Sequence, residues 1–184
     1  MPATKDIQDR VILVNAQDIE TGTAEKLEAH QKGLMHRAFS IFILRKSKST
    51  LETLLQRRAA SKYHSPNLWT NTCCSHPAPG ENLVQAAKRR LKEELQLVIP
   101  ELTAIGQFHY IAHFENGLTE NEVDHVVIGW HHAENFTPNP AEIQACRWIS
   151  LTDLHQELLE KPQEFTPWLK PALAVLEAAL NKST

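Results

Sequence analysis

The sequence predicts an α+β fold in which a mixed β-sheet is packed between α-helices, as an α/β/α sandwich. Three observations support this prediction. Segment 37–46 (RAFSIFILRK) is a continuous apolar run, which is typical of a strand buried on both faces. Segments 82–96 and 166–180 read as helices, and the other apolar segments read as strands. The 184 residues, 42% of them hydrophobic, suffice for one core, so we expect a single domain over residues 1–184.

The N-terminal part of the sheet is predicted from short patterns on either side of this apolar run. Segment 9–15 (DRVILVN) indicates a first strand. Segment 23–33 indicates a capped helical turn or a loop. Segment 51–59 is expected to pair with segment 37–46 as a β-hairpin.

The helix predicted over 82–96 has the clearest pattern in the chain. Its apolar residues recur every four positions and so form one stripe. These residues are Leu83, Ala87, Leu91 and Leu95. Asn82 is a candidate N-cap, and Pro100 follows soon after the expected end.

The C-terminal half is predicted as three strands and a final helix. Segment 104–114 indicates a strand, and Asn116-Gly117 is a strong hairpin signal. Segment 120–132 is then the returning strand. Segment 144–151 indicates another strand, and segment 166–180 closes the chain as a helix.

Charge and composition limit the expected partners and compartment. The formal net charge of −3 gives no overall basic field, so neither nucleic acid nor a membrane is expected as a partner. The start of the chain lacks the apolar core of a signal peptide, and no apolar run approaches the roughly 20 residues that span a bilayer. We therefore expect a cytoplasmic protein, with Cys73, Cys74 and Cys146 as free thiols.

Several short stretches carry residue types that bind metals or transfer protons. Imidazole and thiol candidates are His30, His36, Cys74 and His76. Glu120 and Glu122 share one face of the predicted strand, because side chains alternate along a strand. Two carboxylates on one face repel each other unless a cation or a proton lies between them. Any one of these residues alone is more often a surface or core residue, so only the set as a whole indicates a functional site.

The helix and the loop before it resemble the Nudix box, a pattern of Gly, Glu, Arg-Glu, Glu-Glu and a final Gly. The residues that match are Glu81, Arg89, Leu91, Glu93 and Glu94. The positions that depart, where the box has Gly, Glu and Gly, are Ser75, Arg90 and Gln96. The loss of a carboxylate at Arg90 weakens the case for metal-assisted hydrolysis. From the pattern alone, Arg90 and Glu94 could equally form a surface ion pair.

Seven segments, in order, resemble the type 1 isopentenyl-diphosphate isomerases of the Nudix-like superfamily. The segments are TGTAEKLEAH, HRAFSIFIL, LLQRRAASK, LWTNTCCSHP, AAKRRLKEEL, FHYIAHFENGLTENEVDHV and FTPWL, and the most specific motifs within them are WTNTCCSHP and ENEVDHV. The resemblance implies a Nudix-like mixed sheet between helices. It also implies an isomerase of isoprenoid biosynthesis that converts isopentenyl diphosphate into dimethylallyl diphosphate. One carbon atom is protonated and another is deprotonated, through a carbocation.

The resemblance places four residues at the reacting carbon atoms. Glu122 and Cys74 are expected on opposite sides, and the sequence is compatible with either of them protonating the alkene. We favour Glu122 as the group that gives a proton and Cys74, as a thiolate, as the group that takes one. Tyr110 is expected to hydrogen-bond Glu122, and Trp168 to cover the carbocation with its ring. A thiolate requires nearby cations that lower the pKa of Cys74. The adjacent Cys73 is expected to point to the other face and to be inert.

The resemblance also implies two metal sites. One Zn²⁺ or Mn²⁺ is expected among three imidazoles and two carboxylates, a donor set that suits these ions better than calcium. Its ligands are His30, His36, His76, Glu120 and Glu122. A Mg²⁺ ion bound to the diphosphate is expected at Glu94.

The expected partner is a small-molecule diphosphate. Basic side chains that converge on a diphosphate make charge-assisted hydrogen bonds to it, and arginine can do so through two nitrogens. The residues that match the phosphate-binding positions of the family are Lys26, Arg58, Lys62 and Arg90. The chain is expected to be a monomer or a weak homodimer.

Two other functions compete with the isomerase. A Nudix pyrophosphohydrolase would bind its working metal through the helix carboxylates alone and would not need Cys74. A non-catalytic zinc module would use Cys73, Cys74 and His76, but adjacent cysteines cannot easily reach one tetrahedral ion.

Overall fold

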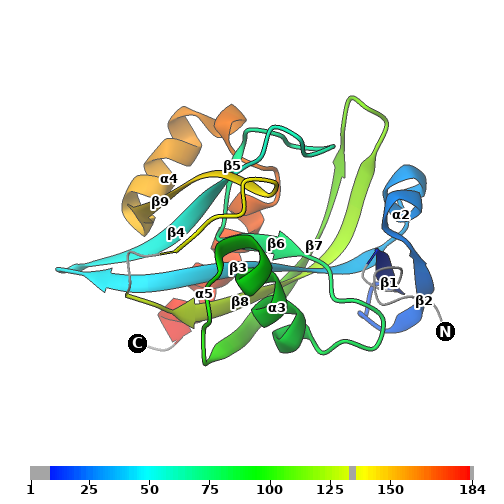
Figure 1. Cartoon of the computed structure of the whole chain (residues 1–184), viewed down its shortest axis with the longest axis horizontal. Coiled ribbons are helices and arrows are strands. Elements are labelled where there is room, and N and C mark those ends of the chain that lie inside the picture. Colours follow the sequence, from blue (N-terminus) through cyan, green and yellow to red (C-terminus); the bar gives the residue numbers. More distant parts are fainter. Residues whose placement is uncertain (1–8, 133–135, 183–184) are drawn as a thin grey trace.

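The computed structural model describes residues 9–132 and 136–182 (Figure 1). Within these ranges the strands form one nine-stranded mixed sheet. The domain predicted over residues 1–184 includes three short segments that lie outside the described residues. Most of the N-terminal stretch considered for a signal peptide is one of them.

The strands are β1 (Arg10–Val14), β2 (Glu20–Glu25), β3 (His36–Ser47), β4 (Thr50–Arg58), β5 (Trp69–Thr70), β6 (Cys73–Ser75), β7 (Leu102–His113), β8 (Thr119–Trp130) and β9 (Ile143–Ser150). The helices are α2 (Lys26–Lys32), α3 (Leu83–Leu95), α4 (Leu151–Glu160), the 3-10 helix η1 (Pro162–Glu164) and α5 (Leu169–Lys182). Strand β8 runs parallel to β3 and antiparallel to β7, which confirms the predicted mixed sheet. The predicted hairpins β3–β4 and β7–β8 are both present.

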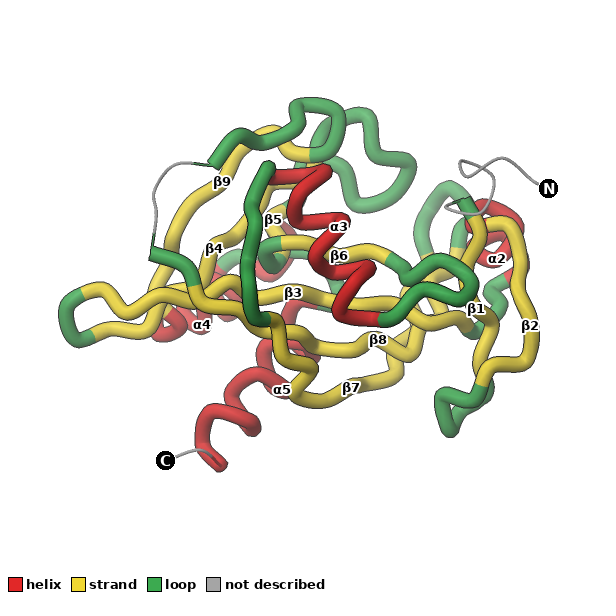
Figure 2. The backbone as a smooth tube through the Cα atoms, turned by 60° about the horizontal axis from the view of Figure 1, so that its bottom comes forward, coloured by secondary structure: helices red, strands yellow, loops and turns green. Residues whose placement is uncertain are grey.

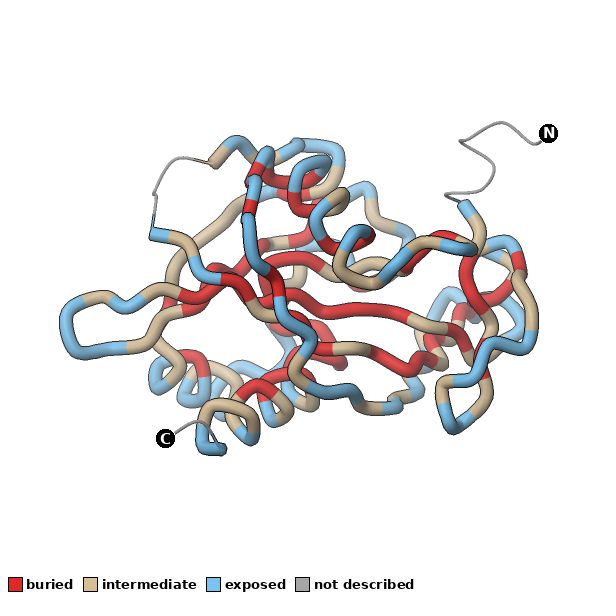
Figure 3. The backbone as a smooth tube through the Cα atoms, turned by 90° about the horizontal axis from the view of Figure 1, so that it is seen from below, coloured by how far each residue is buried: buried red, intermediate tan, exposed pale blue. Residues whose placement is uncertain are grey.

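Two apolar cores lie on opposite faces of β3, because successive side chains of a strand point to opposite faces. Phe39, Ile41 and Ile43 pack with the buried residues of α3. Phe42 and Leu44 pack with those of α4 and α5. Figures 1 and 2 show α3 and α5 on opposite sides of the sheet, and Figure 3 shows buried residues concentrated in the central strands. The α/β/α sandwich and the doubly buried strand are therefore confirmed.

Helix α3 begins at the predicted cap and ends under local strain. The side chain of Asn82 accepts a hydrogen bond from the backbone N–H of Val84 at 2.9 Å. Leu91 and Leu95 are fully buried on the stripe that faces the sheet. Gln96 ends the helix in the left-handed conformation, with φ at 53°. This is the position at which the Nudix pattern has a glycine, so the side chain costs about 1 kcal/mol here.

Some elements were not predicted or begin elsewhere. The short strands β2, β5 and β6 and the helix α4 were absent from the prediction, which instead extended the last strand to residue 151. The hydroxyl of Ser150 caps α4 by accepting from the N–H of Asp153 at 3.0 Å. Helix α5 begins later than predicted because Thr166 is held to β5, its N–H donating to the carbonyl of Trp69 at 3.0 Å. No helix within the described ranges is long and apolar enough to span a membrane.

Candidate active site and metal centre

The register of three neighbouring strands brings the proton-transfer and metal-binding candidates together. Glu122 on β8 pairs with His36 across the parallel ladder to β3. It also pairs with Tyr110 across the antiparallel ladder to β7. Side chains of directly paired residues share one face and lie about 5 Å apart at their Cβ atoms. These three side chains therefore meet on one face of the sheet.

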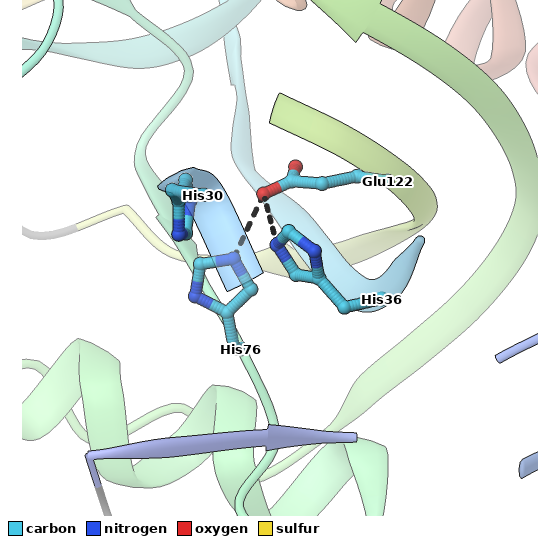
Figure 4. A group of neighbouring side chains, drawn as sticks. All are labelled: His30, His36, His76 and Glu122. Carbon is cyan, nitrogen blue, oxygen red and sulfur yellow. Dashed lines mark hydrogen bonds and ion pairs between the residues drawn. The ribbon is translucent and has the colours of Figure 1, made fainter. Parts of the chain in front are cut away.

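Four predicted metal ligands converge on one point, as Figure 4 shows. The ligand atoms of His30, His36, His76 and Glu122 all lie within 4.8 Å of one another. Oε1 of Glu122 lies 2.8 Å from Nε2 of His76 and 3.2 Å from Nε2 of His36. The residues come from α2, β3, the segment after β6, and β8. Four segments distant in sequence thus supply one cluster.

The hydrogen bonds of the imidazole rings test whether a metal fits this cluster. Nδ1 of His30 donates to the carbonyl of Lys26 at 2.6 Å, and Nδ1 of His36 donates to that of Leu34 at 2.7 Å. Each Nε2 therefore presents a lone pair toward the centre. Nε2 of His30 is buried there with no hydrogen bond. Lone pairs that face a carboxylate require a cation between them, and metal-bound histidines are commonly fixed by such carbonyls. The residues therefore fit a divalent metal ion.

The protonation states also suit metal binding. Burial lowers the pKa of His30 to about 4 and that of His76 to about 3, so both rings are neutral near pH 7. Burial alone would raise the pKa of Glu122, but the neighbouring rings of His36 and His76 hold it well below its usual range. Neutral imidazoles and an ionised carboxylate are the forms that bind metals.

Glu120 belongs to a hydrogen-bond network beside this cluster. The hydroxyl of Tyr110 lies 2.6 Å from Oε2 of Glu120 and 2.8 Å from Oε2 of Glu122, so the predicted bond between Tyr110 and Glu122 is present. Oε1 of Glu120 lies 3.2 Å from Nε2 of His64. Burial and the charge of Glu122 raise the pKa of Glu120 well above its usual range. The network therefore holds a proton next to the ionised Glu122.

Cys74 and Cys73 point to opposite faces of β6, as predicted. Cys73 is fully buried in the core beneath α3, where burial raises its pKa well above the usual range. Cys74 faces a cavity, where its thiol donates to Oδ1 of Asn71 at 2.9 Å. Its Sγ also accepts a hydrogen bond from Nε1 of Trp168 at 3.0 Å. Two thiols on opposite faces cannot bind one zinc ion, so the zinc-module hypothesis is wrong.

The protonation state of Cys74 differs from the expected one. Burial raises the pKa of its thiol to about 12. Hydrogen bonds from Thr70 and Trp168 and the charge of Arg58 act in the opposite direction but do not offset burial. The expectation that nearby cations bring this pKa close to neutrality is therefore wrong for the protein as the structure describes it.

The loop that carries Cys74 is tied to the segment that carries Trp168. The side-chain amide of Asn71 donates to the carbonyls of Ile41 and Cys73 at 3.1 and 2.9 Å, which fastens the loop to β3. The hydroxyl of Thr166 donates to that of Thr70 at 2.9 Å. These bonds fix the indole of Trp168 against the thiol.

The four predicted phosphate-binding cations line the same cavity as Cys74; they are Lys26, Arg58, Lys62 and Arg90. The guanidinium of Arg58 is held by the carbonyls of Ser65 and His64, both at 3.1 Å. Burial and the charges of Lys62 and Arg90 lower the pKa of Lys26 to about 8. Like charges this close repel one another, so the arrangement favours a polyanionic ligand.

The helix pair formed by Arg90 and Glu94 has a buried carboxylate and a partly buried guanidinium. Nη2 of Arg90 lies 2.5 Å from Oε1 of Glu94, whose other oxygen accepts from Nε2 of Gln56 at 3.2 Å. Glu94 is 3% exposed, so the surface ion pair suggested by pattern alone is wrong. Arg90 also lies 2.7 Å from Oε2 of Glu93. A guanidinium thus occupies the carboxylate-rich part of the Nudix pattern.

The structure brings most predicted site residues to the wall of one cavity, and three of them do not line it. The lining residues among the predictions are Lys26, Arg58, Lys62, Cys74, His76, Arg90, Tyr110, Glu120, Glu122 and Trp168. His30 and His36 are fully buried beside the cavity, in the metal cluster. Glu94, the expected magnesium ligand, is engaged by Arg90 and Gln56 instead.

His64 and Asp124 are two of the cavity-lining residues that sequence reasoning missed. His64 stacks on Phe114, and its ring lies edge-on to Trp168; no pattern in the sequence indicates this position. Asp124 lies two residues after Glu122, so strand alternation could have found it. Its Oδ2 accepts from the hydroxyl of Ser40 at 2.8 Å, and its Oδ1 is buried without a hydrogen bond.

The chain matches a known domain family and named bacterial enzymes over most of its length. Residues 34–169 match the NUDIX domain family. The chain is 47% identical to an isopentenyl-diphosphate Delta-isomerase of Aliivibrio fischeri, over 86% of this chain and 89% of that protein. It is 44% identical to an isopentenyl-diphosphate Delta-isomerase of Photobacterium profundum, over 91% of this chain and 93% of that protein.

Solved structures of low sequence identity share the fold. DR0079 from Deinococcus radiodurans superposes with a TM-score of 0.70 at 19% identity, covering 90% of this chain and 97% of that one. A MutT NUDIX hydrolase from Burkholderia pseudomallei gives a TM-score of 0.60 at 21% identity, covering 76% and 96%. These two establish the Nudix fold alone. Together with the identity to the named bacterial enzymes, they show that this chain belongs to the isopentenyl-diphosphate Delta-isomerase family of Nudix-fold proteins.

Proposed function

We propose that this chain catalyses the isomerisation of isopentenyl diphosphate to dimethylallyl diphosphate. The observation that carries the proposal is the single cavity in which Cys74, Glu122 and Trp168 meet a group of cationic side chains. An allylic proton exchange needs an acid and a base on opposite sides of a short carbon chain. A diphosphate substrate needs cations beside them. The cavity supplies both.

The diphosphate is held by the cationic wall. Lys26, Lys62 and Arg90 line both this cavity and a polar one next to it, so they lie at the boundary between the two. Arg58 sits deeper, with its guanidinium 5.3 Å from the centre of the Trp168 ring. We assign a Mg²⁺ ion on the diphosphate to Glu94, as the family resemblance implies. That assignment requires Arg90 to leave Glu94 and turn to the phosphate.

The cluster formed by His30, His36, His76 and Glu122 is assigned to Zn²⁺ or Mn²⁺. Imidazole nitrogens with carboxylate oxygens suit these ions. We also assign Glu120 to this ion as a ligand. To bind the ion, its carboxylate must leave the ring of His64. Such an ion supplies positive charge that fixes the carboxylate of Glu122 beside the substrate.

The carbon chain of the substrate lies between Cys74 and the Glu122–Tyr110 pair. One proton is added to the terminal CH₂ carbon, which leaves a tertiary cation at the branched carbon. A different proton then leaves the CH₂ group next to that cation, and the new double bond forms. The substrate therefore neither gains nor loses a proton overall. The face of Trp168 stabilises the cation by roughly 2 kcal/mol when water is excluded.

The structure offers a route for the proton to Glu122. Glu120 holds a proton, and the hydroxyl of Tyr110 contacts both glutamates. Glu122 can therefore exchange a proton through Tyr110. With Glu122 ionised and Cys74 in the thiol form, Cys74 gives the proton to the terminal carbon, and Glu122 takes the proton that leaves the CH₂ group on the opposite face. Microscopic reversibility makes the two groups exchange roles between the forward and the reverse reaction.

Burial protects the carbocation from water. Trp168, which is 2% exposed, and Tyr110 line the cavity at the position proposed for the carbocation, so their rings keep water from that part of the substrate. Water would otherwise trap the cation as an alcohol. The pocket therefore favours elimination of a proton over hydration.

The position of Arg90 argues against the alternative function, a Nudix pyrophosphohydrolase. This residue replaces a box carboxylate and fills the space between Glu93 and Glu94 with its own positive charge. A hydrolytic metal site needs those carboxylates free for metal ions.

Proton NMR of the purified protein with isopentenyl diphosphate, Mg²⁺ and Zn²⁺ in heavy water tests the function. The expected result is dimethylallyl diphosphate that carries deuterium at the new methyl group. Release of phosphate without isomerisation would instead favour hydrolysis. No reaction in protein shown to contain metal would overturn the proposal. We also propose a cytoplasmic location and a monomer or weak homodimer, which cell fractionation and light scattering test.

A further inference from the structure

Glu142 is a carboxylate at the cationic end of the cavity that no step above uses. Backbone hydrogen bonds hold Glu142 to two neighbouring segments of the site. Its carbonyl accepts from the N–H of Ala59, just after β4, at 3.0 Å. Its N–H donates to the carbonyl of Asn139 at 2.9 Å, and the N–H of Asn139 donates to the carbonyl of Glu94 on α3 at 2.7 Å. The position of Glu142 is therefore set by contacts to the end of β4, which carries Arg58, and to α3, which carries Arg90.

The side chain of Glu142 reaches two of those cations. Its Oε2 forms an ion pair with Nζ of Lys62. Its Oε1 lies 3.4 Å from Nη2 of Arg90. Its side chain is 23% exposed and lines the polar cavity next to the reaction cavity, together with Lys26. Burial would raise the pKa of Glu142, but Lys62 and Arg90 hold it below its usual value, so the carboxylate is ionised.

We propose that Glu142 is an internal counter-ion that competes with the diphosphate of the substrate for Lys62 and Arg90. The proposal rests on the function proposed above, because it assumes that these two cations bind the diphosphate. Both cations donate to anionic oxygens, and Glu142 already presents two such oxygens to them. A diphosphate must therefore displace the carboxylate to reach either one. The same carboxylate then assists release of the product by taking the cations back.

The chain offers a matched control in Glu93. This residue also contacts Arg90, with Oε2 at 2.7 Å from Nη1, but it has no contact with Lys62. Its side chain is 38% exposed, more than that of Glu142, and it does not line either cavity. Removing its charge changes the net charge of the protein as much as removing that of Glu142. Only Glu142 sits between the two cations.

The test is calorimetric titration of inorganic diphosphate with Mg²⁺ into the wild type, Glu142→Gln and Glu93→Gln. We expect Glu142→Gln to lower the Kd about three- to tenfold, since two partly exposed ion pairs no longer compete. Glu93→Gln is expected to change the Kd less than about twofold. An unchanged or higher Kd in Glu142→Gln, with an unchanged unfolding temperature, would overturn the proposal and leave Glu142 as a support for the cations.

Repeating the titration in a Lys62→Met variant tests whether Glu142→Gln acts through Lys62. In a Lys62→Met variant one of the two ion pairs of Glu142 is already gone. The gain from adding Glu142→Gln should therefore be smaller there than in the wild type. An equal gain in both backgrounds would show that Glu142 acts elsewhere. These titrations measure binding alone, so their failure is separate from a failure to isomerise isopentenyl diphosphate.

Discussion

The indole Nε1 of Trp168 donates a hydrogen bond to Sγ of Cys74 at 3.0 Å, although 94 residues separate them in sequence. The bond joins the ring that we propose to cover the carbocation to the thiol that we propose to exchange a proton with the substrate. A second bond, between the hydroxyls of Thr166 and Thr70, ties the segment before α5 to β5. The position of the thiol therefore depends on a helix at the far end of the chain.

Substitution of Cys74 should abolish catalysis and leave the fold intact. Cys74→Ala is expected to abolish isomerisation, because one of the two proton-exchanging groups is gone, while the Kd for diphosphate changes little. Proton NMR measures turnover, and circular dichroism measures the fold. Cys73→Ala is the control: Cys73 lies in the core, so the variant should lose about 1 kcal/mol of stability and keep most activity. A fully active Cys74→Ala variant would show that the thiol has no chemical role.

Replacement of Trp168 by Phe should lower kcat about 10- to 100-fold with little change in KM. Phenylalanine keeps an aromatic face but loses the N–H that donates to Cys74, and its ring attracts a cation less. That hydrogen bond lowers the pKa of the thiol, so its loss should also slow alkylation of Cys74 by iodoacetamide. Trp69→Phe serves as the control, because the Trp69 ring contacts Arg147 instead. An equal fall in kcat in Trp168→Phe and Trp69→Phe would indicate a general packing defect.

Removal of metal should inactivate the enzyme and lower its stability. Dialysis against a chelator is expected to abolish turnover, and Zn²⁺ or Mn²⁺ should restore it. An ion at 100 times its Kd stabilises the folded state by about 2.7 kcal/mol, so the unfolding temperature should rise on addition. His36→Ala should abolish that rise, since its Nε2 faces the cluster. His109 is an exposed histidine on β7 that contacts Asn121, so His109→Ala should leave the metal-induced rise in unfolding temperature unchanged. If both variants lost this rise, the metal would not be bound at the proposed cluster.

Glu81 should contribute a pH-dependent part of the stability. It accepts from Nε and Nη2 of Arg89, both at 2.8 Å, and from the N–H of Ala78 at 3.0 Å. The hydrogen bond from Arg89 lowers the pKa of Glu81 in the folded protein. Its contribution is therefore complete above the unfolded-state pKa and is lost as the pH falls through the folded-state pKa.

The measurement for Glu81 is urea unfolding of the wild type and Glu81→Gln at two pH values. Near pH 7 the variant should be about 1–3 kcal/mol less stable, because a bidentate charged pair is broken. Near pH 3 the difference should shrink, because the wild-type carboxylate takes up a proton. A difference that does not depend on pH would mean that the charge of Glu81 contributes nothing.

Much of the site was predictable because its residues lie in short, dense motifs. The stretch WTNTCCSHP carries Thr70, Asn71, Cys74 and His76, and strand alternation alone separates Cys74 from Cys73. The stretch ENEVDHV puts Glu120 and Glu122 on one face. The expected helix cap at Asn82 is confirmed, because capping depends on a few adjacent residues.

Other features escaped prediction because they depend on what surrounds a residue. Nothing local marks His64, whose place is set by contacts with Glu120, Phe114 and Trp168. The strands β5 and β6 are two and three residues long and exist only because β4 and β3 are there to pair with them. The capping signal of Ser150 and Asp153 was present in the sequence and was overlooked.

The sequence by itself predicted the fold class, because periodicity is a local property of the chain, and its resemblance to a known family implied the family and the residues of the candidate site. Only the tertiary structure decided their protonation and pairing. Burial raised the pKa of Cys74 against the expected effect of nearby cations, and it enclosed the Arg90–Glu94 pair that pattern alone placed on the surface. Desolvation depends on every neighbour packed around a group, so no stretch of sequence contains it.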